Sequence, residues 1–152
     1  MSLAFDVIAR LKGKTLATAE SCTGGGIGNV LTEVSGASNV YKGGIISYCN
    51  EIKHELLNVP EEILAEYGAV SAPVAEAMAR GARIALKTDI AVSVTGLAGP
   101  SGDEFGNPVG TVYIGYADKD TCTFRHYVFA GDRASVRLQA IDAALQLILE
   151  YA

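Results

Sequence analysis

Ser21 stands where an apolar stretch runs into a glycine-rich turn. Residues 15–19 are typical of a buried strand, and the turn Glu20-Ser21-Cys22-Thr23-Gly24-Gly25-Gly26 comes next, followed by apolar residues at helical spacing. A hydroxyl at such a turn lies beside free backbone N–H groups, which can stabilise an oxyanion. We therefore treat Ser21 as a candidate nucleophile and Thr23, Gly24 and Gly25 as the candidate oxyanion turn. The alternative is that Ser21 or Thr23 only caps the helix.

The residues around Ser21 leave two questions open. Three consecutive glycines cost about 1 kcal/mol each relative to Ala in a helix, and close approach of a ligand would explain them. Cys22 competes as nucleophile, because a thiol at a helix N-terminus can have a lowered pKa. It would need a histidine partner, however, and a small buried side chain is the favoured interpretation.

A lysine follows a second predicted strand in Ser47-Tyr48-Cys49-Asn50-Glu51-Ile52-Lys53. Lys53 falls in the first turn of the next helix, where the macrodipole disfavours a cation and lowers its pKa. Tyr48 at the strand end is placed to hydrogen-bond the amine or the nucleophile's hydroxyl. The alternative is a surface lysine and a half-buried tyrosine. His54 and His126 form no Ser-His-Asp set, so a lysine base remains if Ser21 is the nucleophile.

Two later segments are candidates for substrate binding. The Gly- and Pro-rich stretch 96–108 follows an apolar strand, at the end where α/β proteins bind ligands. It contains neither GxGxxG nor a Walker lysine, so we expect a pocket wall. Arg133 and Arg137 share a face at the start of the last helix and suit a phosphate, the alternative being a solvated Arg133 paired with Asp132. The candidate substrate-binding residues are Thr95, Gly96, Ala98, Gly99, Asn107, Gly110, Thr111, Arg133 and Arg137.

Taken in order, the segments AESCTGG, SYCNEIK, VTGLAGP, PVGTVY and GDRASVR resemble the CinA C-terminal domain family. The likeness covers about residues 5–150. The family includes stand-alone nicotinamide-nucleotide amidases, and related proteins often carry a molybdopterin-binding-like domain ahead of this one. We expect residues 1–152 to form the single-domain kind.

The resemblance implies conversion of nicotinamide mononucleotide to nicotinate mononucleotide and ammonia, in pyridine nucleotide recycling. It places the family's serine on Ser21, its tyrosine on Tyr48 and its lysine on Lys53. It also implies a homodimer, with no metal and no cofactor. Loops 95–99 and 107–111 would surround the ring and ribose, with Arg133 on the phosphate. The alternatives are a Ser/Lys amidase for another substrate and a catalytically silent nucleotide-binding or regulatory domain.

The periodicity predicts a three-layer α/β/α domain with a mixed sheet. We expect strands at 15–19, 44–49, 89–95, 109–117 and 121–129, the last two joined as an antiparallel hairpin. We expect both faces of 89–95 to be covered by helices, because it is almost wholly apolar. Predicted helices are 3–12, one after the glycines, one from Asn50, one with Pro60 at its first position, one at 72–87 capped near Ser71, and one capped by Asp132.

Composition limits the classes of partner. The 152 residues carry 17 acidic and 12 basic side chains, a net charge of -5, which disfavours nucleic acid. The three cysteines and two histidines have no metal-ligand spacing, and we expect reduced thiols in a cytoplasmic protein. We find neither a signal peptide nor a membrane-spanning run, so we expect no membrane partner.

Overall fold

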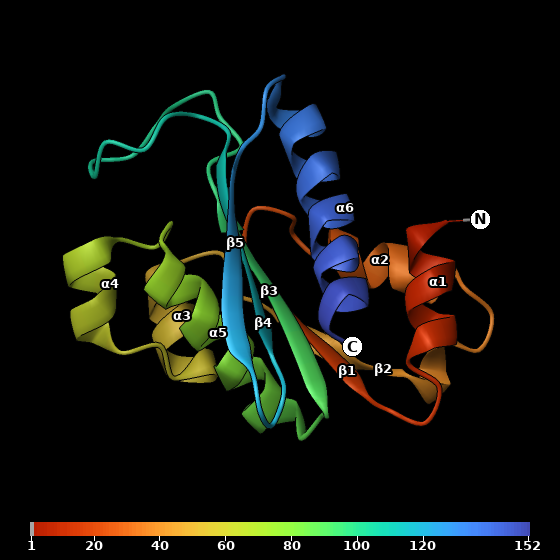
Figure 1. The fold of residues 1–152 in the computed structure, drawn as a ribbon. Coiled ribbons are helices and arrows are strands. Elements are labelled where there is room, and N and C mark those ends of the chain that lie inside the picture. The colour runs from red at the N-terminus through yellow and green to blue at the C-terminus, as the bar shows by residue number, and fades with distance from the viewer. Residues whose placement is uncertain (1) are drawn as a thin grey trace.

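A single five-stranded sheet lies between two layers of helices in the computed structural model, which describes residues 2–152 (Figure 1). The strands are β1 (Leu16–Glu20), β2 (Tyr41–Ile46), β3 (Ile90–Gly96), β4 (Thr111–Ala117) and β5 (Cys122–Val128). Their order in the sheet is β2-β1-β3-β4-β5. β1, β2 and β3 run parallel to one another, and β4 runs antiparallel to its two neighbours, β3 and β5. The predicted mixed sheet and hairpin are therefore confirmed.

Helices cover both faces of the sheet, as the apolar character of β3 predicts. On one face lie α3 (Asn50–Leu57), α4 (Glu61–Tyr67) and α5 (Ala72–Leu86). On the other lie α1 (Leu3–Arg10), α2 (Gly26–Thr32) and α6 (Arg133–Tyr151), with a short 3-10 turn at Ala37–Asn39 before β2. Side chains of β3 alternate between the two buried clusters: Val92 and Val94 pack toward α6, and Ala91 packs toward α5.

Two predicted caps need correction. Pro60 is the N-cap of α4 and not its first helical residue. Ser71 is the N-cap residue of α5 as predicted, but its hydroxyl donates to the carbonyl oxygen of Gly68 at 2.9 Å and makes no capping hydrogen bond to the helix. The predicted Asp132 cap is confirmed, because its Oδ1 accepts from the Ser135 N–H at 2.9 Å.

The second strand is displaced from its predicted range. It spans Tyr41–Ile46 and not 44–49, so Ser47 and Tyr48 lie in the connection before α3. Glu20, in contrast, is the last residue of β1 and not part of the turn. This register matters because Glu20 pairs with Ile46 of β2 and Val94 of β3. The segments that follow these three strands therefore meet at one edge of the sheet.

The three glycines also have conformational and packing reasons within the protein itself. Gly24 and Gly25 have φ angles of 59° and 99°, in the left-handed region that favours glycine. A Cβ on Gly26 would lie 2.6 Å from the Ile141 side chain of α6. Gly24 and Gly25 therefore permit the backbone conformation of the turn, and Gly26 permits its packing against α6.

Candidate active site

Ser21 and Lys53 are in direct contact, although 32 residues separate them in the chain. Ser21 follows β1, where its N–H donates to the Val94 carbonyl oxygen at 3.0 Å. Lys53 projects from the first half of α3, and its Nζ lies 3.2 Å from the Ser21 Oγ. The Nζ also donates to the carbonyl oxygen of Ser47 at 2.6 Å. The predicted pair is thus placed by the parallel arrangement of β1 and β2 and by the start of α3.

Burial has the largest influence on the pKa of Lys53. The side chain is 1% exposed, so the alternative of a surface lysine is wrong. Desolvation lowers the pKa of the amine from its ordinary 10.5 to about 8. A neutral amine keeps N–H groups for the Ser47 carbonyl and has one lone pair for the Ser21 hydroxyl proton. The site therefore holds a base beside a buried hydroxyl.

The neighbouring thiol is not set up to compete. Cys22 is 6% exposed, and desolvation raises the pKa of its thiol to about 11 despite the opposing effects of nearby Arg137, Lys53 and Arg133. At neutral pH it stays protonated and is a poor nucleophile. The interpretation of Cys22 as a small buried side chain is confirmed.

The Tyr48 hydroxyl has its hydrogen-bond partner outside the Ser21–Lys53 pair. The Tyr48 side chain is 64% exposed, more than the half-buried position expected, and its hydroxyl accepts a hydrogen bond from Arg133 at 3.0 Å. Arg133 also donates to the Gly99 carbonyl oxygen at 2.7 Å. Among residues 2–152 the Tyr48 hydroxyl has neither Lys53 nor Ser21 as a partner, which corrects its expected contact. It lies beside the arginine of the site.

The oxyanion turn differs in part from its prediction. The Gly24 N–H donates to the Ser21 carbonyl oxygen at 3.0 Å, so it is already engaged. Glu20 accepts from the Thr23 hydroxyl at 2.6 Å and from the backbone N–H groups of Ile27 and Gly28 at 2.9 and 3.1 Å. The buried carboxylate therefore already accepts hydrogen bonds from the N–H groups at the N-terminus of α2 that an anionic ligand would otherwise use.

A cavity of about 280 Å³ opens onto the pair. It is lined by Ser21, Cys22, Tyr48 and Lys53 and by the loop after β3. Predicted substrate-binding residues that line it are Thr95, Gly96, Ala98, Gly99 and Arg133. The exposed guanidinium of Arg133 keeps unused N–H donors after its two contacts, because arginine has five. The cavity thus combines a nucleophile, a base and a cation.

Four other predicted substrate-binding residues hold protein segments in place. Asn107 donates to Asp103 at 2.8 Å, and the Thr111 hydroxyl donates to the Pro108 carbonyl oxygen at 2.7 Å. The Gly110 N–H donates to the Leu97 carbonyl oxygen at 2.8 Å. Arg137 donates to the carbonyl oxygens of Cys22 and Thr23 at 3.0 and 3.3 Å. These contacts stabilise the cavity wall and the turn, and none of the four lines the cavity as the structure describes it.

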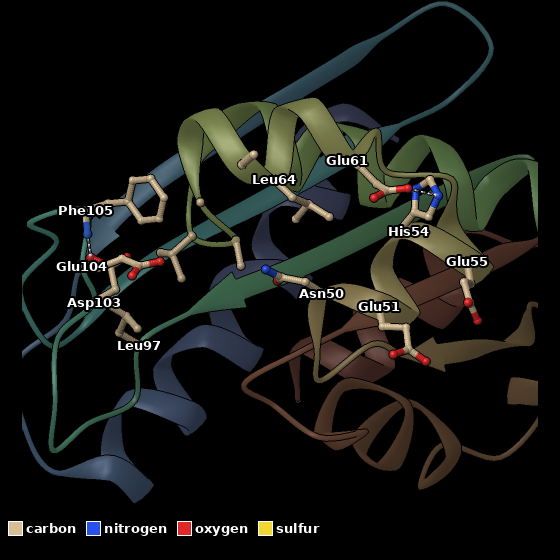
Figure 2. Close-up of a pocket in the computed structure, with 14 residues that line it drawn as sticks. Asn50, Glu51, His54, Glu55, Glu61, Leu64, Leu97, Asp103, Glu104 and Phe105 are labelled. Carbon is tan, nitrogen blue, oxygen red and sulfur yellow. Dashed lines mark hydrogen bonds and ion pairs between the residues drawn. The ribbon is translucent and has the colours of Figure 1, made fainter.

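The larger cavity of the protein, about 800 Å³, adjoins this one and has a different character. It lies between α3, α4 and the loop after β3, and shares Asn50, Ala69, Val70 and Leu97 with the smaller cavity. Figure 2 shows the carboxylates that surround it, one of which, Glu61, pairs with His54 at 3.1 Å. We assign the chemistry to the smaller cavity, because it holds Ser21 and Lys53 and the larger one does not. The acidic side chains of the larger cavity are Glu51, Glu55, Glu61, Asp103 and Glu104.

Comparison with known proteins identifies the family of this chain. The sequence-family model named CinA C-terminal domain matches residues 2–152. This chain belongs to the CinA C-terminal domain family. Among its relatives, a CinA-like protein of Geobacter sulfurreducens is 51% identical over 141 residues, 91% of this chain and 34% of the relative. One from a Synechococcus species is 48% identical over 151 residues, 97% of this chain and 36% of the relative. The chain thus spans about a third of the length of these curated relatives.

Solved structures of the CinA superfamily share the fold across nearly the whole domain. A superfamily protein from Escherichia coli superposes with a TM-score of 0.96 at 34% identity, covering 99% of this chain and 88% of that one. The competence/damage inducible protein CihA of Agrobacterium tumefaciens superposes with a TM-score of 0.90 at 36% identity, covering 97% and 92%. The predicted α/β/α fold is therefore confirmed.

Sequence reasoning missed several residues of the candidate site. Glu20, which is 2% exposed, directly precedes the candidate serine. A carboxylate shortly before the start of a helix was the sequence signal that could have indicated its role at the N-terminus of α2. The backbone carbonyl of Ser47, which holds the lysine, gives no signal in a sequence. Asn50 and Ser101 also line the cavity. Within residues 2–152, no group of three or more His, Cys, Asp or Glu side chains is placed to hold a metal, and no helix has the length and apolar character to cross a bilayer.

Proposed function

We propose that this CinA domain is an amidohydrolase that converts nicotinamide mononucleotide to nicotinate mononucleotide and ammonia. The observation that carries the proposal is the 3.2 Å contact between the Ser21 Oγ and the buried Lys53 amine. A lysine whose pKa is lowered to about 8 can take a hydroxyl proton near neutral pH. The choice of substrate rests on the likeness to a family that includes such amidases.

The pair would work in two steps. In the first, the Ser21 oxygen bonds to the carboxamide carbon while its proton passes to Lys53. Lys53 then gives that proton to the amide nitrogen, the C–N bond breaks, ammonia leaves and an ester to Ser21 remains. In the second step, Lys53 takes a proton from water, whose oxygen bonds to the ester carbon. The Ser21 oxygen leaves with that proton, and the acid is released.

The charges around the site favour one orientation of the substrate. Arg133 supplies the cation at the smaller cavity, and a guanidinium can bind phosphate oxygens in pairs. The adjoining larger cavity is lined by five carboxylates, which repel a phosphate. We therefore place the phosphate toward Arg133, on the side of the site that begins α6.

The test is ammonia release from nicotinamide mononucleotide by purified protein. We expect turnover by the wild type and a loss of at least about 1000-fold in Ser21→Ala and Lys53→Met, since each removes a member of the reacting pair. Ser35→Ala and Lys42→Met change exposed residues and serve as matched controls. Wild-type release in Ser21→Ala would disprove the mechanism. Activity on other amides but not the nucleotide would favour a different substrate, and mononucleotide binding without any hydrolysis would favour a silent regulatory domain.

A further inference from the structure

The turn that carries Ser21 is held from two sides by charged groups that do not line the cavity. On the α2 side, Glu20 accepts three hydrogen bonds, from the Thr23 hydroxyl and from two N–H groups of the helix. Both oxygens of the carboxylate are engaged in this way, one with Ile27 and Thr23 and the other with Gly28. The Glu20 carboxylate, which is next to Ser21 in the chain, therefore accepts its hydrogen bonds from the first turn of α2 and from Thr23.

On the α6 side, Arg137 holds the backbone of the same turn. Its Nε donates to the Cys22 carbonyl oxygen at 3.0 Å, and a terminal nitrogen donates to the Thr23 carbonyl oxygen at 3.3 Å. Helix α6 lies on the face of the sheet opposite to α3, which carries Lys53 (Figure 1). The Cys22 carbonyl is therefore turned toward α6.

The geometry of the peptide unit fixes where the next N–H points. The Cys22–Thr23 bond is trans, and in a trans peptide the C=O and N–H point in opposite directions. With the Cys22 carbonyl directed at Arg137, the Thr23 N–H is directed away from Arg137. Within residues 2–152 this N–H has no hydrogen-bond acceptor, whereas the Gly24 N–H is bonded to Ser21.

A charged donor on a carbonyl also strengthens the N–H of the same peptide unit. Hydrogen bonds in a chain polarise one another, and those that involve an ionised group are the strongest. Arg137 thus increases the positive character of the Thr23 N–H without approaching the substrate. Such an N–H suits an oxygen on which negative charge develops.

We propose that Arg137 and Glu20 are positioning residues that orient and polarise the Cys22–Thr23 peptide unit so that the Thr23 N–H stabilises the oxyanion formed at Ser21. The inference rests on the proposed function, because an oxyanion forms only when Ser21 attacks a carbonyl. It gives Arg137 a role in the turn, in place of the substrate contact that its sequence position suggested.

Arg137→Gln is the main test, measured as ammonia release from the mononucleotide. Direct removal of an oxyanion donor costs about 100- to 1000-fold in kcat, and an effect through one peptide unit is smaller. We expect kcat to fall about tenfold while KM changes less than about twofold. The midpoint of the pH profile should not move, because Arg137 is not among the groups that shift the pKa of Lys53. Arg125→Gln, which breaks the ion pair with Glu150 on the distant β5 edge, is the matched control.

Two further variants separate positioning from folding. Arg137→Ala should recover part of its kcat when guanidinium ion is added at millimolar concentration, whereas a folding defect would not respond. Arg137→Lys keeps the charge and reaches one carbonyl, so we expect about a threefold loss in kcat. Glu20→Gln, nearly identical in shape, should also lower kcat more than it changes KM.

A second readout does not depend on the nucleotide. A fluorophosphonate reacts with an activated serine and places its P=O oxygen where the oxyanion would lie, so Arg137→Gln should slow labelling of Ser21 about tenfold. Equal labelling and equal kcat in wild type and Arg137→Gln would overturn the inference alone, as would a raised KM with unchanged kcat. Labelling of Ser21 without ammonia release would disprove the proposed substrate. The labelling rates of wild type and Arg137→Gln would then still decide the inference about Arg137. A wild type that neither labels nor releases ammonia would overturn the proposed function and this inference together.

Discussion

The reactivity of Ser21 should follow the titration of Lys53, whose pKa burial lowers to about 8. Below that pH the amine is protonated and cannot accept the hydroxyl proton; above it the neutral base is present. The rate should therefore rise with pH through about 8 and level off above it. An ordinary lysine would instead put the rise near 10.5.

The magnitude follows from the fraction of neutral amine. With a pKa of about 8, roughly 1% of Lys53 is neutral at pH 6, about 9% at pH 7 and about 90% at pH 9. The rate should thus rise about ninetyfold between pH 6 and pH 9, with most of the rise below pH 8. At an unshifted pKa of 10.5 only about 0.03% would be neutral at pH 7.

The assay should use a reagent without a titrating group, because the phosphate of a mononucleotide titrates near pH 6. A neutral aryl sulfonyl fluoride meets this need: its rate of reaction with Ser21 is measured by mass spectrometry from pH 5.5 to 10.5. Ser21→Ala identifies the labelled residue, and Lys53→Met should lose the rise with pH. A profile that is flat from pH 6 to 9, or one with a midpoint above 10, would refute the assignment of Lys53 as the base.

Three other variants test separate parts of the site. Lys53→Met should raise the free energy of unfolding at pH 7 by about 1–2 kcal/mol in urea titrations. Lowering the pKa of Lys53 from 10.5 to about 8 costs the folded protein about 3 kcal/mol below pH 8, and loss of the bond to Ser47 in the variant offsets part of this gain. The gain should vanish above about pH 10.5. Arg133→Ala should raise KM for the mononucleotide about 10- to 100-fold but leave KM for the phosphate-free nucleoside unchanged, and an equal rise for both would place the phosphate elsewhere. Tyr48→Phe should change kcat/KM by less than about tenfold and keep the pH midpoint near 8, since its hydroxyl contacts Arg133; a shifted midpoint would put Tyr48 on the lysine.

Local patterns were enough for most of the architecture. The apolar run at β3 predicted a strand covered on both faces, and the short Asp118–Asp120 connection predicted the β4–β5 hairpin. These features depend on periodicity and on short connections, which a sequence displays directly. The start of β2 was wrong by three residues, because Gly43 and Gly44 weaken a strand pattern that pairing with β1 nevertheless imposes.

The candidate site divides in the same way. The sequence by itself determined that a serine follows one strand, a lysine follows another and a glycine-rich loop follows a third. Parallel pairing of β1 with β2 and β3 brings those three strand ends to one edge, which is why such positions could be named in advance. Only the tertiary structure decided which polar atoms touch. Burial lowers the pKa of Lys53, and the Ser47 carbonyl oxygen accepts a hydrogen bond from its amine. Glu20 accepts hydrogen bonds from the N-terminus of α2, and Arg137 contacts the backbone of the turn instead of the cavity. Desolvation and hydrogen-bond direction arise from neighbours distant in the chain, so no local pattern encodes them.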